Sequence, residues 1–359
     1  MKTRLILPAL LLALTGAVLA PAMFAAPVGP APAPAVSPDV VAGNLNPAVS
    51  PGVDFFEYAN GGWLMRNPIP ATESRWGIGQ CVREQLYTSL RKINEQGATV
   101  PADDDARKIG DFWAAALDPA HAEQTGLRPL AAELAKVDAV TSAQQALDVA
   151  FAWGPLGVSA FFDAGIYQDE RDSDRMALHL GQGGLGLPHR DYYFKPEAGI
   201  AKVRAEYPVH LARVLVLLGR DPAAATPAAQ AVMAFETELA RVSRPLAELR
   251  DPPKNYHKMT PSDLTAKYTP SIAWPARIAT WSLHPATVIV GQPEFFTALD
   301  GLLAKTPVPV LQDYLRLQLL RVYSPFLGDA FVNEDFRFYG QTISGAKQLR
   351  DRWKRVLDA

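Results

Sequence analysis

Apolar residues recur at three- and four-residue intervals through most of the chain, and this spacing restricts the sequence to a mainly helical fold. The clearest example is the segment 78–97. There the spacing predicts a helix that buries one apolar stripe and ends at Gly97. The residues of that stripe are Ile78, Val82, Leu86, Leu90 and Ile93.

A second helix is predicted just after the first. The acidic run Asp103, Asp104 and Asp105 suits the positive N-terminal end of a helix, and Pro119 marks where the helix must stop. The residues expected to pack inward from it are Ile109, Phe112, Trp113 and Leu117.

Capping signals and periodicity predict the remaining helices. Ser142 is a suitable N-cap for a helix that follows it, and Thr260 with Asp263 fits a capping box. The other helical segments lie at 201–219, 227–242, 309–326 and 347–357.

Only two stretches, 158–169 and 174–182, are typical of strands, and they predict a hairpin across the charged turn 170–173. The expected fold class is therefore mainly α, with a small β-hairpin.

The first 22 residues have the order of a secretory signal peptide. Lys2 and Arg4 precede an apolar run, and small residues surround Ala22. The run is short for a membrane span, which needs roughly 20 residues, so an uncleaved anchor is the alternative and membrane attachment is expected only in that case. We expect an exported, periplasmic or extracellular protein in which residues 23–44 form a Pro/Ala-rich linker.

Composition excludes some classes of partner and some chemistry. The formal net charge is −2, so the sequence offers no basic field for nucleic acid. Cys81 is the single cysteine, which rules out an internal disulfide, and we interpret it as a small buried hydrophobe rather than a nucleophile.

Residues 181–186, with the sequence GQGGLG, match the G-x-G-x-x-G pattern of dinucleotide-binding loops. Such a loop needs a helix directly after it, whereas Pro188 and the residues around it predict a turn. We therefore interpret the motif as a glycine-rich structural turn.

The motifs of hydrolytic enzymes are missing from the sequence. A G-x-S-x-G elbow does not occur, and no two histidines lie three to five residues apart, so neither H-E-x-x-H nor H-x₃-H is present. The histidines are His121, His179, His189, His210, His257 and His284. We predict no catalytic residue, no metal ligand and no cofactor in this chain; a metal site assembled from distant residues is the alternative.

Arg75 and Arg83 lie eight residues apart next to a segment dense in aromatic residues, glycine and proline. If the helix begins near Trp76, this spacing is a little over two turns, so both guanidinium groups can lie on one side. Two such groups can bind a peptide carboxylate or carbonyl oxygens. The alternative is an ordinary surface arginine pair that holds Glu73 or Glu84.

Four stretches together resemble the neprilysin family of zinc endopeptidases, peptidase family M13, which includes endothelin-converting enzymes and bacterial oligopeptidases. They are DFFEYANGGWLMRNPIPATESRWG at 54–77, GLGLPHRDYY at 184–193, RDPPKNYHKM at 250–259 and FRFYGQTISGAKQLRDRWKRVLD at 336–358. The resemblance runs in order from about residue 43 to the last residue and includes the glycine-rich turn.

The resemblance implies that substrate capping and zinc catalysis belong to different lobes of the complete enzyme. Members of the family have two largely helical lobes around a central cavity. One lobe holds zinc through H-E-x-x-H and a downstream glutamate, and the other caps the cavity and limits the size of the peptides that enter. The N-terminal half supplies mostly the cap, so residues 45–359 are expected to be this region without the catalytic zinc domain. Zinc is then a cofactor of the complete family enzyme only.

Two residues inherit a role from the resemblance. Arg75 in S-R-W-G and Arg83 in R-E match family positions that face the C-terminal side of a peptide substrate. His189 stands where the glycine-rich turn usually carries an acid, and Gln80 with Cys81 replaces a segment that usually contains one. These departures leave the preferred peptide open.

The resemblance implies the capping part of an exported metalloendopeptidase, inactive alone, whose partners are a peptide substrate and a missing or separate catalytic lobe. The last predicted helix has no closing glycine or proline, and the family's zinc motif lies beyond it, so we expect a truncated product or an incomplete record. The alternatives are a stand-alone peptide-binding or regulatory module, and one chain of a split peptidase.

Overall fold

The computed structural model describes residues 42–101 and 104–358. The expected signal peptide, most of the expected linker and Asp103 lie outside these residues. The chain divides into two compact units, the first reaching Pro68 and the second running from Ile69 to Ala359.

The described part of the first unit contains the 3-10 helix η1 (Ala42–Asn44) and helix α1 (Phe55–Arg66). Asp54 caps α1 by accepting a hydrogen bond of 2.9 Å from the N–H of Glu57. Arg66 donates to the carbonyl oxygen of Gly43 at 2.6 Å, which ties the two helices together.

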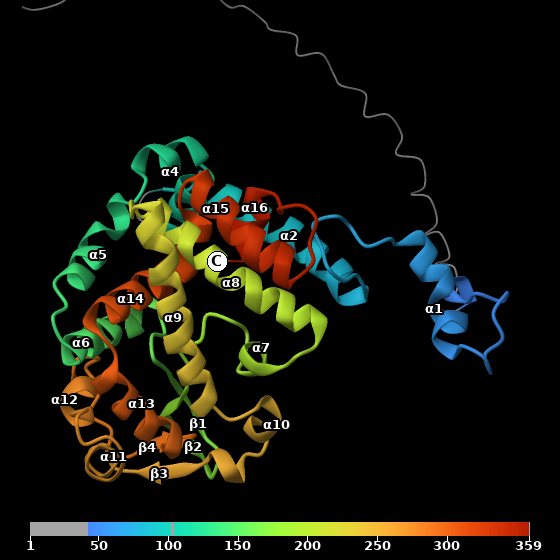
Figure 1. Cartoon of the computed structure of the whole chain (residues 1–359). Helices are drawn as coiled ribbons and strands as arrows, with labels where there is room; N and C mark the ends of the chain where they lie inside the picture. Colours follow the sequence, from blue (N-terminus) through green and yellow to red (C-terminus); the bar gives the residue numbers. More distant parts are fainter. Residues whose placement is uncertain (1–41, 102–103, 359) are drawn as a thin grey trace, which may run out of the picture. The chain divides into compact units, whose positions relative to one another are not determined.

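The second unit is built mainly from helices, and the segments predicted from periodicity and capping are helical over most of their length, except for 347–351 (Figure 1). Ser142 accepts a hydrogen bond from Gln145, and Thr260 accepts one from Asp263, as their caps predict. The helices are α2 (Ile78–Gly97), α3 (Asp105–Ala116), α4 (Pro119–Thr125), η2 (Arg128–Leu130), α5 (Ala131–Asp138), α6 (Ala143–Trp153), η3 (Gly154–Leu156), α7 (Asp191–Phe194), α8 (Ala198–Leu217), α9 (Pro222–Val242), α10 (Leu246–Leu249), η4 (Pro253–Asn255), α11 (Pro261–Tyr268), α12 (Trp274–Ala279), α13 (Pro293–Lys305), α14 (Val308–Tyr323), η5 (Ser324–Phe326), α15 (Asp329–Asp335), the π-helix η6 (Phe336–Ile343) and α16 (Arg352–Leu357).

The predicted hairpin forms, but it belongs to a larger sheet than expected. Strands β1 (Phe162–Asp169) and β2 (Asp172–Gln182) pair antiparallel, and β3 (His257–Met259) and β4 (Val288–Val290) extend them in the order β1-β2-β4-β3. The pairing of β2 with β4 is parallel. The expectation of only two strands was wrong because three-residue strands are too short to show an alternating pattern.

The core of the second unit lies where the sheet meets α6, α9, α13 and α14 (Figure 1). On α14, within the predicted helical range 309–326, Leu311, Leu315 and Leu319 are fully buried. The Trp274 ring packs edge-on against Phe162 at 5.2 Å between ring centroids. Helix α14 of this core also lines the second of the two pockets described below.

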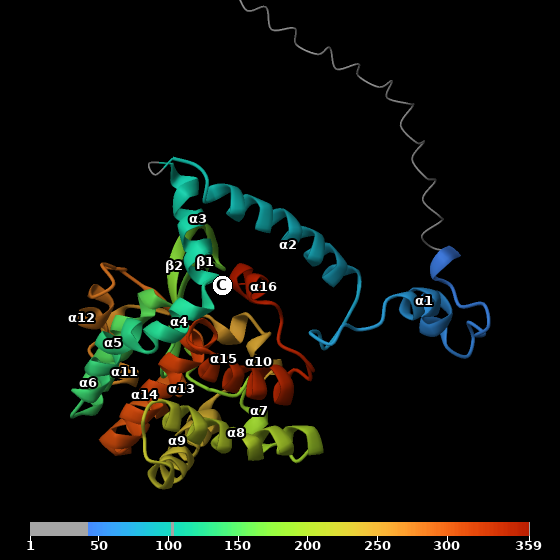
Figure 2. The same ribbon diagram turned by 90° about the horizontal axis from the view of Figure 1, so that it is seen from above.

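The apolar stripe of α2 points the opposite way from the expectation. Ile78 is 74% exposed, Val82 57%, and Leu86 52%. The buried residues of α2 are instead Tyr87, which packs on Trp353 of α16, and Gly97, which lies against α3 (Figure 2). The expectation failed because helical spacing identifies a stripe but not the element that covers it.

Helix α3 shows the same pattern in part. Trp113 is buried as predicted, whereas Ile109 and Phe112 are 48% and 58% exposed. We call the exposed large apolar side chains of these two adjacent helices the α2–α3 apolar face, defined by Ile78, Val82, Leu86, Ile93, Ile109 and Phe112. An exposed apolar surface of this kind is typical of a site that another protein segment covers.

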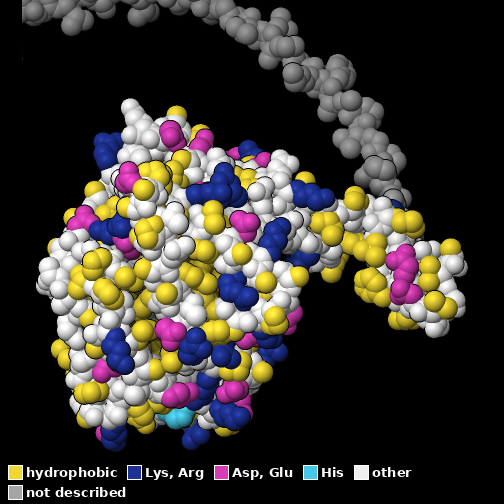
Figure 3. Space-filling view, in the orientation of Figure 1, with side chains coloured by type: hydrophobic (Ala, Val, Ile, Leu, Met, Phe, Trp, Pro, Cys, Tyr) yellow, Lys and Arg dark blue, Asp and Glu magenta, His cyan; other side chains and the backbone are white. Residues whose placement is uncertain are grey.

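The rest of the visible surface carries charges of both signs. Figure 3 shows Lys and Arg side chains interspersed with Asp and Glu side chains over the face in view. Within the described ranges, no helix has the length and apolar character needed to cross a membrane.

Candidate functional site

Arg75 and Arg83 line one pocket in the second unit, which we call the arginine pocket. Its volume is about 500 Å³, a size typical of ligand sites. The loop 72–75, the first turns of α2, one face of η6 and the segment 346–358 form its walls. Stretches at opposite ends of the second unit therefore meet at this site.

The segment 347–351 was predicted to be helical and is not, because its backbone bonds to the loop before α2. The N–H groups of Lys347 and Gln348 both donate to the carbonyl oxygen of Ala71, at 2.8 and 3.0 Å. In a helix, the N–H groups of these residues would point along the helix axis to carbonyl groups four residues earlier and could not both bond to Ala71. The final helix, α16, starts only at Arg352.

Glu73 is the acidic centre of the pocket. Arg83 donates to Glu73 Oε2 at 2.9 Å, and Arg350 binds both carboxylate oxygens, at 2.8 and 2.9 Å. The Glu73 side chain is only 7% exposed, and a buried carboxylate between two guanidinium groups is a strong, geometrically fixed arrangement. The interpretation that Arg83 holds Glu73 is thus confirmed, while Glu84 pairs with Lys354 instead.

Asp358 closes the other side of the same network. It accepts hydrogen bonds from the Tyr87 hydroxyl and from Arg350, the latter at 2.9 Å. Burial and the neighbouring Asp358 carboxylate raise the pKa of Tyr87 to about 12, so the hydroxyl stays protonated and continues to donate. The network holds α16 against α2.

Arg75 differs from the other arginines of the pocket. It is exposed, and it has no hydrogen bond or ion pair with any part of the chain that the structure describes. Arg83 keeps one buried nitrogen, Nε, without a partner in the same range. Among the lining residues four are arginines and two are carboxylates, so the pocket has an excess of positive charge for an anionic ligand.

The π-helix η6 forms the third wall through Phe336 and Gly340, with Ser344 just beyond its end. The N–H of Ser344 donates to the carbonyl of Tyr339, five residues back, at 3.2 Å. Such wide turns are rare and occur often at functional sites, because they reposition side chains that a regular helix would place elsewhere.

Sequence reasoning named Glu73 only as a partner of a surface arginine pair, and it missed Arg350 and Arg355 as parts of this site. Arg350 and Arg355 belong to a short, unusually basic run near residue 350, and that composition is a usable signal. Nothing in the sequence places the run beside the loop 72–75, because the two are separated by most of the chain.

The glycine-rich motif is a turn, as interpreted. Strand β2 ends at Gln182, and the only helix that follows closely is the four-residue α7. Gly184 has a φ of +77°, and an added Cβ would lie 2.6 Å from the Tyr314 hydroxyl oxygen, so glycine is required there.

The described residues do not fit a catalytic zinc ion. Within residues 42–101 and 104–358, no group of three His, Cys, Asp or Glu side chains is placed to hold a metal. Cys81 is half-buried and has no resolved role.

The family follows from the comparison of the whole sequence. The sequence model for the N-terminal part of "Peptidase family M13" matches residues 51–359. The chain belongs to this family. The expectation of a neprilysin-type N-terminal region is therefore confirmed.

Relatives and solved structures agree with the family. Endothelin-converting enzyme 1 of Mus musculus is 29% identical over 316 residues, which is 84% of this chain and 40% of the relative. Endothelin-converting enzyme-like 1 of Homo sapiens is 28% identical over 321 residues, covering 83% of this chain and 40% of the relative. The chain thus spans less than half the length of these relatives.

The zinc metalloprotease Zmp1 of Mycobacterium tuberculosis, solved with an inhibitor, is 32% identical with a TM-score of 0.81, covering 88% of this chain and 48% of that one. PepO of Lactobacillus rhamnosis shares the fold at 18% identity, with a TM-score of 0.74, 85% of this chain and 48% of that one. The mainly α fold of an M13 cap lobe is confirmed.

Proposed function

We propose that this chain is the substrate-capping portion of an exported, neprilysin-type zinc metalloendopeptidase, with Arg75 and Arg83 contacting the C-terminal side of a peptide. One observation supports this most directly: S-R-W-G and the basic run near residue 350, both parts of the family resemblance, form one arginine-rich pocket. The export, the peptide substrate and the catalytic partner are all part of this proposal.

The arginine pocket supplies recognition rather than chemistry. Arg75 is free to bind a carboxylate, while Arg83 is held by Glu73 and offers its remaining donors from a fixed position. Binding a peptide end in this way would orient the peptide. A cap contributes to catalysis through such orientation, while the chemical step takes place on the catalytic lobe. Zinc would polarise the scissile carbonyl in the complete enzyme, and no residue described here fits that ion.

The exposed α2–α3 apolar face is an argument for the proposal that a second lobe packs on this chain. Six large apolar side chains on two adjacent helices are exposed, which is costly for a surface that meets only water. We propose that the catalytic lobe of the enzyme, whether on the same or a separate chain, packs on this face.

We predict that the 359-residue chain alone has no peptidase activity. The purified protein would be analysed for bound zinc and for hydrolysis of a fluorogenic peptide. Stoichiometric zinc together with chelator-sensitive turnover would contradict the prediction. Activity that returns only when a second polypeptide is added would instead identify a split enzyme.

Arg75 gives the cleanest test of peptide recognition. The variant Arg75→Ala should bind a short peptide about tenfold or more weakly, the effect of losing one charge-assisted hydrogen bond, with an unchanged melting temperature. Calorimetry with a peptide and its C-terminal amide measures this, and Arg107→Ala on α3 is the matched control. The same weakening in the control, or equal binding of the amide, would contradict the role.

Arg83→Ala should weaken peptide binding too, but with a lower melting temperature because Glu73 loses one of its two partners. Tight, arginine-dependent binding by a soluble monomer would favour the alternative function, a stand-alone peptide-binding module.

A further inference from the structure

A second cavity lies over the glycine-rich turn 183–190, and we call it the glycine-turn pocket. Its volume is about 520 Å³, and it shares no lining residue with the arginine pocket. The turn, the segment after α9, helix α10 and the C-terminal half of α14 form its walls. Its size matches sites that hold small organic ligands.

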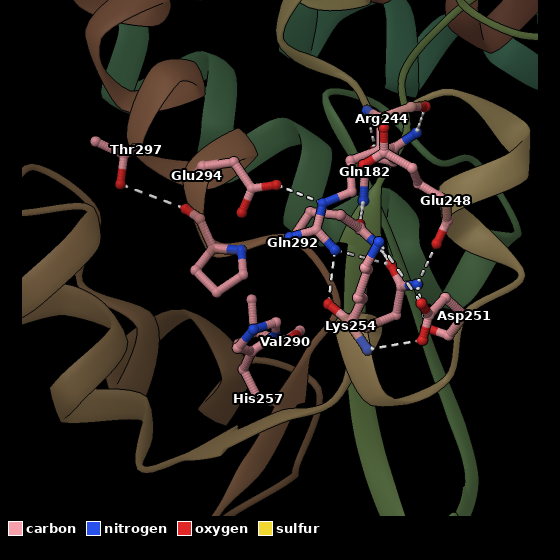
Figure 4. Close-up of polar contacts among 12 residues, drawn as sticks. Gln182, Arg244, Glu248, Asp251, Lys254, His257, Val290, Gln292, Glu294 and Thr297 are labelled. Atoms are coloured by element: carbon pink, nitrogen blue, oxygen red, sulfur yellow. Dashed lines mark hydrogen bonds and ion pairs between the residues drawn. The ribbon is translucent and has the colours of Figure 1, made fainter.

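One wall of this pocket is rigid. Gln182 and Arg244 exchange two hydrogen bonds, of 2.7 and 3.0 Å, between the end of β2 and the segment after α9 (Figure 4). The Arg244 guanidinium is already committed to Glu294 at 2.5 Å and to the carbonyl of Lys254 at 2.6 Å. Arg244 therefore has a structural role in the pocket wall, and the Glu294 carboxylate compensates its charge.

Two other guanidinium groups of the pocket form no ion pair within the described ranges, although the charge of Arg321 also acts on the carboxyl groups of Asp163, Glu236 and Asp335. Arg321 donates to the carbonyl oxygen of Leu185 at 2.9 Å and forms no ion pair. Arg190 makes a long hydrogen bond of 3.4 Å to the carbonyl of Ala240 and lies over the Phe194 ring. Asp163 is the one carboxylate among the lining residues, so the pocket carries excess positive charge.

The turn itself adds backbone donors. The N–H groups of Gly183, Gly184 and Leu185 bond to no described part of the chain. The carbonyl of Gly184 accepts from the Tyr314 hydroxyl at 2.8 Å, on the buried side. Because the peptide bond is trans, the N–H of Leu185 points away from Tyr314. Consecutive free N–H groups of this kind form nests that bind anions.

The other lining residues are apolar or neutral. Leu246 and Leu249 of α10 and Val322 of α14 lie on the rim and wall. His189 also lines the pocket, and its Nδ1 is buried without a partner within the described residues. The pocket therefore offers cationic and N–H groups for an anion beside an apolar surface for a side chain.

We propose that the glycine-turn pocket binds a small carboxylate that carries an apolar side chain, as the C-terminal residue of a peptide does. The carboxylate lies between Arg190 and Arg321, and the apolar group lies against Leu246 and Leu249. The site is independent of the arginine pocket and of any zinc lobe.

The test is a ligand-detected NMR titration of the full 359-residue chain with N-acetyl-leucine, its amide and inorganic phosphate. We expect binding of N-acetyl-leucine, no binding of the uncharged amide, and weaker binding of phosphate. Arg321→Gln and Arg190→Gln should each weaken binding roughly tenfold or more. Arg175→Gln on the exposed hairpin and Arg75→Ala in the arginine pocket should leave it unchanged.

Leu246 provides a variant that avoids any folding defect, because its side chain is 42% exposed. Leu246→Glu places a negative charge at the pocket and should abolish binding of N-acetyl-leucine, whereas Leu246→Gln removes only the apolar contact and should weaken binding less, with the same melting temperature. Equal binding of acid and amide, loss of binding only in Arg75→Ala, or no effect of Leu246→Glu would overturn the proposal. Phosphate binding as tightly as N-acetyl-leucine would also overturn it, in favour of a simple anion site.

Discussion

Glu236 is a carboxyl group buried among tyrosines in the second unit. It accepts hydrogen bonds from the hydroxyls of Tyr193 at 2.7 Å and Tyr207 at 3.1 Å, and from the N–H of Gly186 at 3.3 Å. These bonds favour the carboxylate, but loss of hydration is the larger effect and raises the pKa of Glu236 to about 7. Because Gly186 of the glycine-rich turn donates to Glu236, the hydrogen bonding of this turn depends on the protonation state of Glu236.

The raised pKa predicts a pH-dependent stability. The folded state holds the proton more tightly than the unfolded chain, whose carboxyl has a pKa near 4.5. The free energy of unfolding should fall as pH rises from about 4.5 to 7, by up to roughly 3 kcal/mol, and level off above that. Asp335, whose pKa burial raises to about 6, adds a fall of the same sign at lower pH.

The variant Glu236→Gln should remove the fall between pH 6 and 7, which lies above the pKa of Asp335. Thermal unfolding measured at several pH values checks this, with Glu238→Gln, an exposed residue of the same helix, as control. A Glu236→Gln protein with the same slope as the parent chain would contradict the assignment.

At the scale of elements, α2 and α3 cross with their backbones in contact. A Cβ added at Gly110 would lie 2.1 Å from the nitrogen of Ala98, and one at Gly97 would lie 2.6 Å from the carbonyl oxygen of Ala106. Only glycine allows this approach, so the two residues set the geometry of the helix pair that carries the α2–α3 apolar face.

We predict that Gly110→Ala lowers the stability of the second unit by about 1–3 kcal/mol, because the helices must separate to admit the methyl group. The matched control is Gly79→Ala, also in a helix of this pair but with open space around its Cβ. That control should stabilise slightly, by up to about 1 kcal/mol, through helix propensity. Equal melting temperatures for the two variants would contradict the close crossing.

At the scale of the whole molecule, the α2–α3 apolar face determines how the chain behaves in solution. Val82 and Leu86 lie one turn apart on α2 and are more than half exposed. Chains that expose such a surface associate through it unless another segment covers it.

The double variant Val82→Lys with Leu86→Lys should reduce self-association with a change of unfolding free energy within about 0.5 kcal/mol per site. Light scattering and thermal unfolding provide the two measurements. Tyr87→Ala, which removes a buried side chain next to these residues, should instead destabilise the protein by about 3–5 kcal/mol. A large loss of stability in the double variant would show that the stripe is covered in the chain alone.

Local signals account for the parts of the fold that the sequence predicted correctly. The caps Ser142 and Thr260 act within three residues of themselves, and the spacing of Leu311, Leu315 and Leu319 reflects a single helix. The hairpin β1–β2 joins neighbouring segments, so its turn was visible too. The strands β3 and β4 were missed because they exist only through pairing with partners far away in the sequence.

For the candidate site, the sequence by itself indicated the membership in the family and most of the helices. It also named Arg75 and Arg83 as contacts of a peptide, and that role stays a prediction. Tertiary structure decided that Arg83 and Arg350 both bind Glu73, that segment 347–351 is not helical, and that most of the α2 stripe is exposed. The reason is physical: periodicity and capping act over a few residues. The partner of a charge or an apolar face depends on which distant segments the fold brings together.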